Sequence, residues 1–258
     1  MKASAAILTV LAFASFVECG LTQESTEAKA GELTQLLVKQ HEAWSTKLST
    51  PGASIQSKES SRQGAVVQYR LYVTGLPSDK LYTALNWPVN QPKPMETLRG
   101  LSLGKDGLVS CLGRTPEECS DPDFAGDHGA VDFTFMPAKG EPFRVALVSE
   151  DSEDFRAATI IVPDPISAKD KGCTLDVVRL SAGFEVAYFT GSGYPPNSEA
   201  DFALESYGEK HPVKTTSDNQ GSIRFTIMPY VKGHPRGTTK VAGAGMACSP
   251  SLKFDWGR

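Results

Sequence analysis

The sequence has little positive charge in any one place and no long hydrophobic run beyond its first residues. Its 26 Lys and Arg stand against 30 Asp and Glu, which gives a formal net charge of −4 over 258 residues. Because no basic cluster is long enough to follow a phosphate backbone, we expect no nucleic-acid partner. Past the N-terminus no run of about 18 apolar residues occurs, so we expect no transmembrane segment in the mature chain.

Motifs that carry catalytic chemistry are also scarce. The four histidines are His41, His128, His211 and His234. They form neither an H-E-x-x-H motif nor an H-x-H pair, so the sequence shows no ligand set for a catalytic metal. A Gly-rich phosphate loop that opens a helix is missing as well. We therefore expect a protein that is not an enzyme and that needs no cofactor.

The N-terminus has the pattern of a targeting segment. A short positive region precedes the apolar run Ala5–Phe13, which predicts a signal peptide over residues 1–19, cleaved after Cys19. The triplet Ala12–Ala14 offers a second cleavage point inside the run. Lipidation of Cys19 is disfavoured because Glu18, and not a small residue, precedes it. Export predicts a periplasmic or extracellular location.

Two stretches downstream are near copies of each other. Gly129–Pro142 (GAVDFTFMPAKGEP) and Gly221–Pro235 (GSIRFTIMPYVKGHP) share Phe, Thr, Met and Pro at one constant spacing. A second echo precedes each copy, GLPSDKLYTAL from Gly75 and GYPPNSEADFAL from Gly193. Repetition of this kind predicts one structural unit used twice, and hence two related domains in tandem.

Both copies read as β-structure. Apolar residues alternate with polar ones over Val67–Val73, Val131–Phe135, Ile223–Ile227 and Leu252–Trp256. Alternation over short runs separated by Gly, Pro, Asn and Asp clusters is typical of half-buried antiparallel strands. The fold class we expect is mainly β, with two tandem immunoglobulin-like antiparallel β-sandwich domains.

The predicted domain bounds follow from these patterns. The first sandwich covers 65–166 with an insertion at 110–129, and the second covers 172–258, with the polar segment SAKDK joining them. Residues 50–64 are Ser-rich and polar, and we interpret them as a linker.

An amphipathic helix is predicted before the linker, over residues 23–49. Its apolar residues fall on one face at 3.6 residues per turn: Leu33, Leu36, Leu37, Trp44 and Leu48. We expect this face to pack on the first domain or on a second copy of itself. Binding at a membrane interface is disfavoured because the polar face lacks dense Lys and Arg.

The second domain carries a family resemblance. Its segments GSGYPPNSE, DNQGSIRFTIMPYVKG and CSPSLKFDWG are similar to Ig-like repeats of exported bacterial proteins, which mostly lack an assigned activity. The resemblance covers the second domain well and the first in part. It rests on turn chemistry and core alternation, so it implies a fold and transfers no site residues.

Four cysteines follow the signal peptide: Cys111, Cys119, Cys173 and Cys248. An even number in an exported chain favours disulfides, and four cysteines allow three pairings. The domain division selects Cys111–Cys119 and Cys173–Cys248, because each bridge then stays within one domain.

One acidic loop resembles a calcium site. Asp121, Asp123, Asp127 and Asp132 occupy positions 1, 3, 7 and 12 of a segment with Gly126 at position 6, as in an EF-hand-type Ca²⁺ loop. Position 5 is Ala, position 12 is Asp instead of Glu, and the flanks do not look helical. A solvated acidic loop is the alternative interpretation.

Trp87 is the candidate ligand platform. It precedes a Pro-rich loop near a domain end, where sandwich folds bind their ligands. It also continues the alternation of a strand, and large aromatic side chains more often belong to a core.

These patterns favour an exported, non-enzymatic binding or structural module of the cell envelope or extracellular space. Its partner would be an unknown protein or glycan surface component, with self-association through the N-terminal helix as a further expectation. The alternative is a polysaccharide-active enzyme or an accessory carbohydrate-binding protein. Glycoside hydrolysis needs two carboxylates facing each other across a cleft, and the acidic residues here lie mainly in predicted turns.

Overall fold

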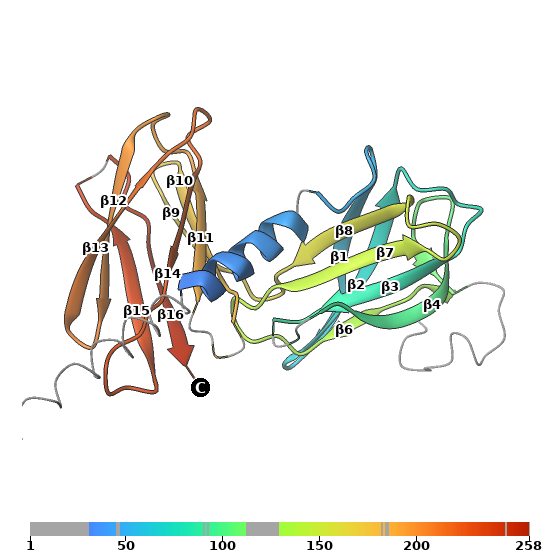
Figure 1. Cartoon of the computed structure of the whole chain (residues 1–258), viewed down its shortest axis with the longest axis horizontal. Coiled ribbons are helices and arrows are strands. Elements are labelled where there is room, and N and C mark those ends of the chain that lie inside the picture. Colours follow the sequence, from blue (N-terminus) through green and yellow to red (C-terminus); the bar gives the residue numbers. More distant parts are fainter. Residues whose placement is uncertain are drawn as a thin grey trace, which may run out of the picture.

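The computed structural model describes residues 31–44, 47–89, 91, 93–111, 129–181, 183, 186–245 and 247–257. Within these ranges a helix at 31–44 precedes a series of strands, β1 to β16, which pair in antiparallel fashion. Figure 1 shows the strands grouped into two bodies with the helix between them. None of the helical structure in these ranges is long and apolar enough to cross a membrane.

The first body is a two-sheet sandwich. One sheet has the order β1-β2-β6, and the other has the order β5-β4-β3-β7-β8. The strands are β1 (Ser54–Gln63), β2 (Val66–Thr74), β3 (Tyr82–Trp87), β4 (Met95–Leu103), β5 (Val109–Ser110), β6 (Phe133–Phe135), β7 (Phe143–Ser149) and β8 (Arg156–Ile161). One continuous apolar core between the sheets runs from Ile55 to Ile161.

The second body repeats this architecture. Its sheets have the orders β14-β11-β10-β9 and β13-β12-β15-β16. The strands are β9 (Ile166–Asp170), β10 (Cys173–Arg179), β11 (Ala187–Ser192), β12 (Glu199–Ser206), β13 (Glu209–Thr216), β14 (Ile223–Ile227), β15 (Arg236–Gly243) and β16 (Ser251–Gly257). A separate core runs from Ile166 to Phe254.

The two sandwiches share topology and register. The order β1-β2-β6 corresponds to β10-β11-β14, and β4-β3-β7-β8 corresponds to β13-β12-β15-β16. Phe133 pairs with Tyr69 in the first copy, and its repeat equivalent Phe225 pairs with Phe189 in the second. The predicted fold class is confirmed: the chain is mainly β, with two tandem antiparallel sandwich domains.

The second sequence echo marks a tight turn that requires glycine. Gly75 has φ +75°, and a Cβ there would lie 2.2 Å from the carbonyl oxygen of Gly52. Gly193 has φ +81°, and a Cβ there would lie 2.2 Å from the carbonyl oxygen of Gly172. In both copies the backbone of a neighbouring turn occupies the space that a side chain would need.

Two predicted linkers are wrong. Most of 50–64 forms β1, which pairs with β2 from Ser54 to Gln63 with one register shift between Glu59 and Ser61. The segment SAKDK lies largely in β9, at the edge of the second domain, where it pairs with β10. Both are edge strands. β1 exposes most of its side chains, and β9 buries only Ile166. Their backbone hydrogen bonds therefore form without the apolar alternation that predicts a strand.

The predicted helical face is also partly wrong. The helix spans 31–44 among the described residues, and Trp44 is 5% exposed as expected. Leu33 and Leu36 are instead 54% and 50% exposed. The buried side contains Leu37 and Val38, because the helix contacts two domains and not one surface.

Among the described cysteines, the predicted bridge Cys173–Cys248 is confirmed, with 6.0 Å between its Cα atoms. Cys111 is also disulfide-bonded. Its predicted partner Cys119 lies outside the described residues, so that pairing stays a prediction.

Candidate functional site

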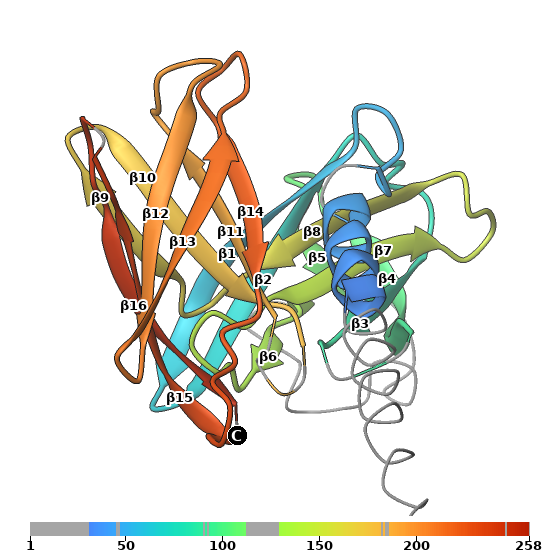
Figure 2. The same cartoon turned by 60° about the vertical axis from the view of Figure 1, so that its left-hand side comes forward.

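The most elaborate arrangement of side chains surrounds the helix 31–44. Figure 2 shows the helix beside the sheet that contains β3, β7 and β8. Trp44, at the C-terminal end of the helix, contacts β7 and β8 of this sheet. Its indole N–H donates to the carbonyl oxygens of Val145 and Thr159, both at 3.2 Å. Its ring meets that of Trp87 edge to face at 5.5 Å. One buried aromatic side chain thus fixes the C-terminal end of the helix on this sheet.

The same helix binds the second domain through a small apolar cluster. Leu37 and Val38 pack against the buried side chains of Leu180, Val186 and Tyr188. Figure 1 shows the helix lying between the two sandwiches, with one end beside the second. The helix is therefore a shared element of both domains.

Polar contacts accompany this packing. The Tyr188 hydroxyl donates to Glu42 Oε1 at 2.6 Å, and Arg224 lies 3.8 Å from the same oxygen. Burial, together with the Glu42 carboxylate, raises the pKa of Tyr188 above its usual range. Near the start of the helix, Thr34 donates to the sulfur of Met228 at 3.5 Å.

The region where the two domains meet, called the joint below, has a second set of contacts on the side of the β1–β2 hairpin. The Gly140 N–H donates to the carbonyl oxygen of Asp164 at 2.7 Å, and the Arg179 N–H donates to the carbonyl oxygen of Gly140 at 2.9 Å. Arg62 from the hairpin donates to the Asp164 carboxylate at 2.7 Å. A Cβ at Gly140 (φ +76°) would lie 2.7 Å from Ile166 Cδ1. These bonds hold the short connection between β8 and β9 against both domains.

Two nitrogen-bearing side chains have buried atoms where the helix meets the first domain: Arg144 of β7 and His41 of the helix itself. Arg144 is 1% exposed, and its Nε and Nη2 have no hydrogen-bond partner in the described part of the chain. Its guanidinium lies 5.0 Å from the Trp87 ring centroid, a cation–π contact that offsets part of the burial cost. His41 Nδ1 is likewise buried without a partner. Burial and the nearby Arg144 lower the pKa of His41 to about 4, and burial lowers that of Arg144 to about 10.

The structure places little of the predicted calcium loop. Asp121, Asp123 and Asp127 lie outside the described residues. Asp132 is 8% exposed and accepts hydrogen bonds from Ser60 at 2.7 Å and Arg70 at 3.0 Å. In the ranges that the structure describes, no group of three or more His, Cys, Asp or Glu could hold a metal ion.

Trp87 is half-buried beneath the helix. Its ring contacts Trp44 on one side and Arg144 on another, and its N–H donates to the carbonyl oxygen of Gln91 at 2.8 Å. The ring thus packs between the helix and the sheet. It belongs neither to the sandwich core nor to an open platform. Its binding role stays a prediction.

Gly100-Leu-Ser102-Leu-Gly104 matches the G-x-S-x-G pattern of serine hydrolases. A hydrolase nucleophile would lie on a sharp turn between a strand and a helix. Ser102 lies inside β4 instead, its hydroxyl 3.2 Å from the carbonyl oxygen of Ser110, and a β-turn follows at 104–107. This serine links two strands.

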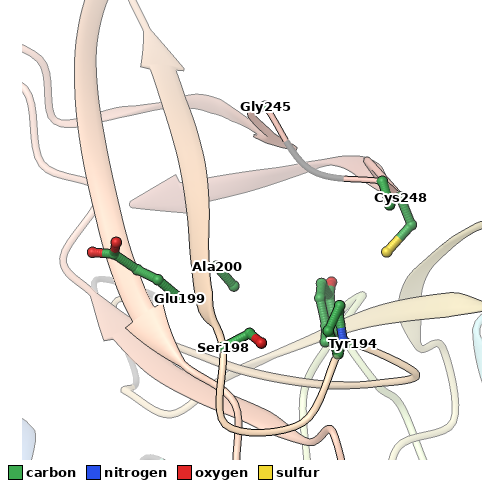
Figure 3. A pocket seen from close by; sticks show the side chains of 8 residues that line it. Tyr194, Ser198, Glu199, Ala200, Gly245 and Cys248 are labelled. Carbon is green, nitrogen blue, oxygen red and sulfur yellow. The ribbon is translucent and has the colours of Figure 1, made fainter.

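A small cavity lies at the end of the second domain, beside the disulfide. It has a volume of about 160 Å³ and is lined by Tyr194, Pro195, Ser198, Glu199, Ala200, Gly245, Ala247 and Cys248. Figure 3 shows Tyr194 between the start of β12 and Cys248. Burial raises the pKa of Tyr194 to about 12. The volume is below the 300–1,000 Å³ or so of typical small-molecule sites.

Comparison with known proteins identifies no family for this chain. No family model and no curated protein matches the chain. Among solved structures, the tetra-tandem repeat in the extending region of a large adhesion protein matches with a TM-score of 0.26 and 8% identity, over 79% of this chain and 48% of that one. The chain spans about half the length of that structure. A likeness at this level supports no assignment of function.

Proposed function

We propose that this chain is an exported, non-enzymatic module that holds two β-sandwich domains at a fixed angle and binds a component of the cell envelope or extracellular space. The observation that carries the proposal is the helix 31–44, which packs on both domains at once. Inter-domain interfaces within a chain are usually small and permit relative motion. A helix bound to both sides, together with the Gly140 hydrogen bonds, removes that freedom.

Disulfide chemistry supports the export part of the proposal. Cys173–Cys248 closes a loop across the second domain, and Cys111 is also oxidised. Structural disulfides of this kind persist in oxidising compartments. The signal peptide predicted over residues 1–19 agrees with this location.

The roles of the described charged side chains support a structural reading. Arg70 and Asp132 join neighbouring strands, Arg62 and Asp164 close the joint, and Glu42 ties the helix to the second domain. Each of these three carboxylates is thus engaged in a contact that positions an element of the fold.

Sedimentation with purified cell envelope of the producing organism tests this function. We expect the oxidised protein to be retained saturably, and Trp44→Ala to be retained less because its domains are no longer held together. Leu33→Ala, on the exposed side of the same helix, is the matched control and should behave as wild type. Absence of retention, or equal retention of wild type and Trp44→Ala, would contradict the proposal.

A further inference from the structure

Aromatic side chains from three separate segments converge at one end of the second domain. Tyr207 comes from the turn between β12 and β13, Tyr230 and His234 come from the loop between β14 and β15, and Trp256 comes from β16. Trp256 is 2% exposed, whereas Tyr207 and Tyr230 are 53% and 65% exposed. The tyrosine ring centroids lie 6.3 and 6.5 Å from that of Trp256. Two exposed phenol rings thus lie next to one buried indole.

The backbone of Tyr207 is in an unfavourable conformation. Its φ is 49°, and Gly208 next to it has φ 81°, as in a type I′ hairpin turn. Asn, Asp or Gly usually fills the first of these positions, and a bulky side chain with positive φ is an outlier. Such conformations cluster at binding and active sites, where the surrounding structure maintains them.

Three contacts hold the Tyr207 ring in one orientation. It stacks on His234 with 3.7 Å between centroids and 21° between planes. Its hydroxyl donates to the carbonyl oxygen of Arg236 at 2.7 Å. The ring passes over Gly237, where a Cβ would lie 2.5 Å from Tyr207 Cε2 and 2.8 Å from Trp256 Cζ2. An exposed ring that is already fixed loses little conformational entropy when it binds.

The size and charge of this surface narrow the ligand class. Lys232 and Arg236 are exposed nearby, as are Glu209 and Asp255, so neither sign of charge prevails and no anion or cation is favoured. A stable complex with a protein partner buries about 800 Å² of surface on each side and uses several anchor residues. Two tyrosine side chains cover only part of such an area, so a small ligand fits this surface better than a protein does. The apolar C–H face of a sugar ring matches a single aromatic face, with its hydroxyls left in water.

We propose that Tyr207, Tyr230 and His234 form a binding site for neutral hexose or N-acetylhexosamine rings of a glycan. The sugar packs on the exposed Tyr230 ring and on the exposed side of the stacked Tyr207–His234 pair, and Trp256 lies next to both tyrosine rings. The proposal deepens the binding half of the function given above, and it places the sugar site on the second domain and not at Trp87. It does not depend on the fixed angle between the domains.

Calorimetric titration with neutral oligosaccharides tests the site. The probes are hexasaccharides of α- and β-linked glucose, β-linked mannose and N-acetylglucosamine, titrated into the full oxidised chain. We expect at least one to bind, with affinity about tenfold lower in Tyr230→Ala and in Tyr207→Asn. Asn tolerates positive φ, so Tyr207→Asn removes the ring and keeps the turn.

Met136→Ala is the control, because Met136 is a 76% exposed apolar residue of the first domain. It should bind the sugar as wild type does, and all three variants should keep the wild-type melting temperature to within a few degrees. Failure of every probe to bind, or equal affinity of the tyrosine variants and wild type, would overturn the site. Since no part of this titration reports the angle between the domains, it can fail while the fixed two-domain arrangement stands.

Discussion

Acidification should release the helix 31–44, because the folded protein resists protonation of His41. The His41 ring lies edge-on to Tyr188 at 5.6 Å, and the Arg144 charge from β7 helps to lower the pKa of His41. Glu42 is the nearest carboxylate on the helix, but it is engaged with the Tyr188 hydroxyl and lies 3.8 Å from Arg224. The imidazolium would therefore form in a buried position beside a cation.

The size of the effect follows from the change in pKa. Burial, followed by Arg144, lowers the pKa of His41 from 6.5 to about 4. The unfolded or undocked chain thus binds the proton at higher pH than the folded protein does. The contribution of His41 to the free energy of unfolding is fully present above pH 6.5. It is lost as the pH drops from 6.5 to 4, and the free energy of unfolding is then lower by about 3 kcal/mol. Between pH 7 and pH 4.5 the loss from this residue is about 2 kcal/mol.

Urea denaturation at pH 7.0 and pH 4.5, followed by tryptophan fluorescence, measures this loss. Carboxylates also titrate in this range, so the quantity to compare is the change in unfolding free energy between wild type and His41→Gln. We expect His41→Gln to lose about 2 kcal/mol less than wild type on acidification. His211→Gln, at an exposed histidine of β13, should match wild type. Equal losses in wild type and His41→Gln would refute the reasoning.

Three further predictions concern the joint, the disulfide and the calcium loop. Trp44→Ala should lower the free energy of unfolding by about 3–5 kcal/mol, since it removes a buried indole, and a urea titration showing less than 1 kcal/mol would contradict the assigned packing. Replacing both Cys173 and Cys248 by Ser should lower the free energy of unfolding by about 4 kcal/mol in the same assay, because the bridge spans 75 residues. An unchanged urea midpoint would argue against a stabilising disulfide. Excess Ca²⁺ and EDTA should give the same melting temperature by calorimetry, because Arg70 and Ser60 already engage the Asp132 carboxylate; a rise of several degrees with Ca²⁺ would show a structural ion.

The repeat made the domain architecture predictable. Phe133 and Phe225 recur because the same position of the same strand must fill the same core in each copy. Turn glycines such as Gly193 recur because backbone sterics leave no room for a side chain. Features that local sterics or core packing require can therefore be predicted from the sequence.

Elements that are stabilised by neighbouring elements cannot be predicted from the sequence in the same way. The sequence of β1 predicts a linker, because an edge strand satisfies its backbone through β2 and needs little apolar character. The apolar stripe of the helix identified the element but not its partners, since two domains share its buried side. Tyr207 resembled an ordinary turn residue, and only its positive φ together with the stacked His234 distinguishes it.

The distance between the two domains in solution tests the central claim most directly. Spin labels on Ser78→Cys in the first domain and Asn219→Cys in the second occupy exposed turns, and pulsed electron paramagnetic resonance reports their separation. The fixed arrangement predicts one narrow distance distribution for the otherwise wild-type protein, and a broad one when Trp44→Ala is added. A broad distribution in the wild-type background, unchanged by Trp44→Ala, would contradict it.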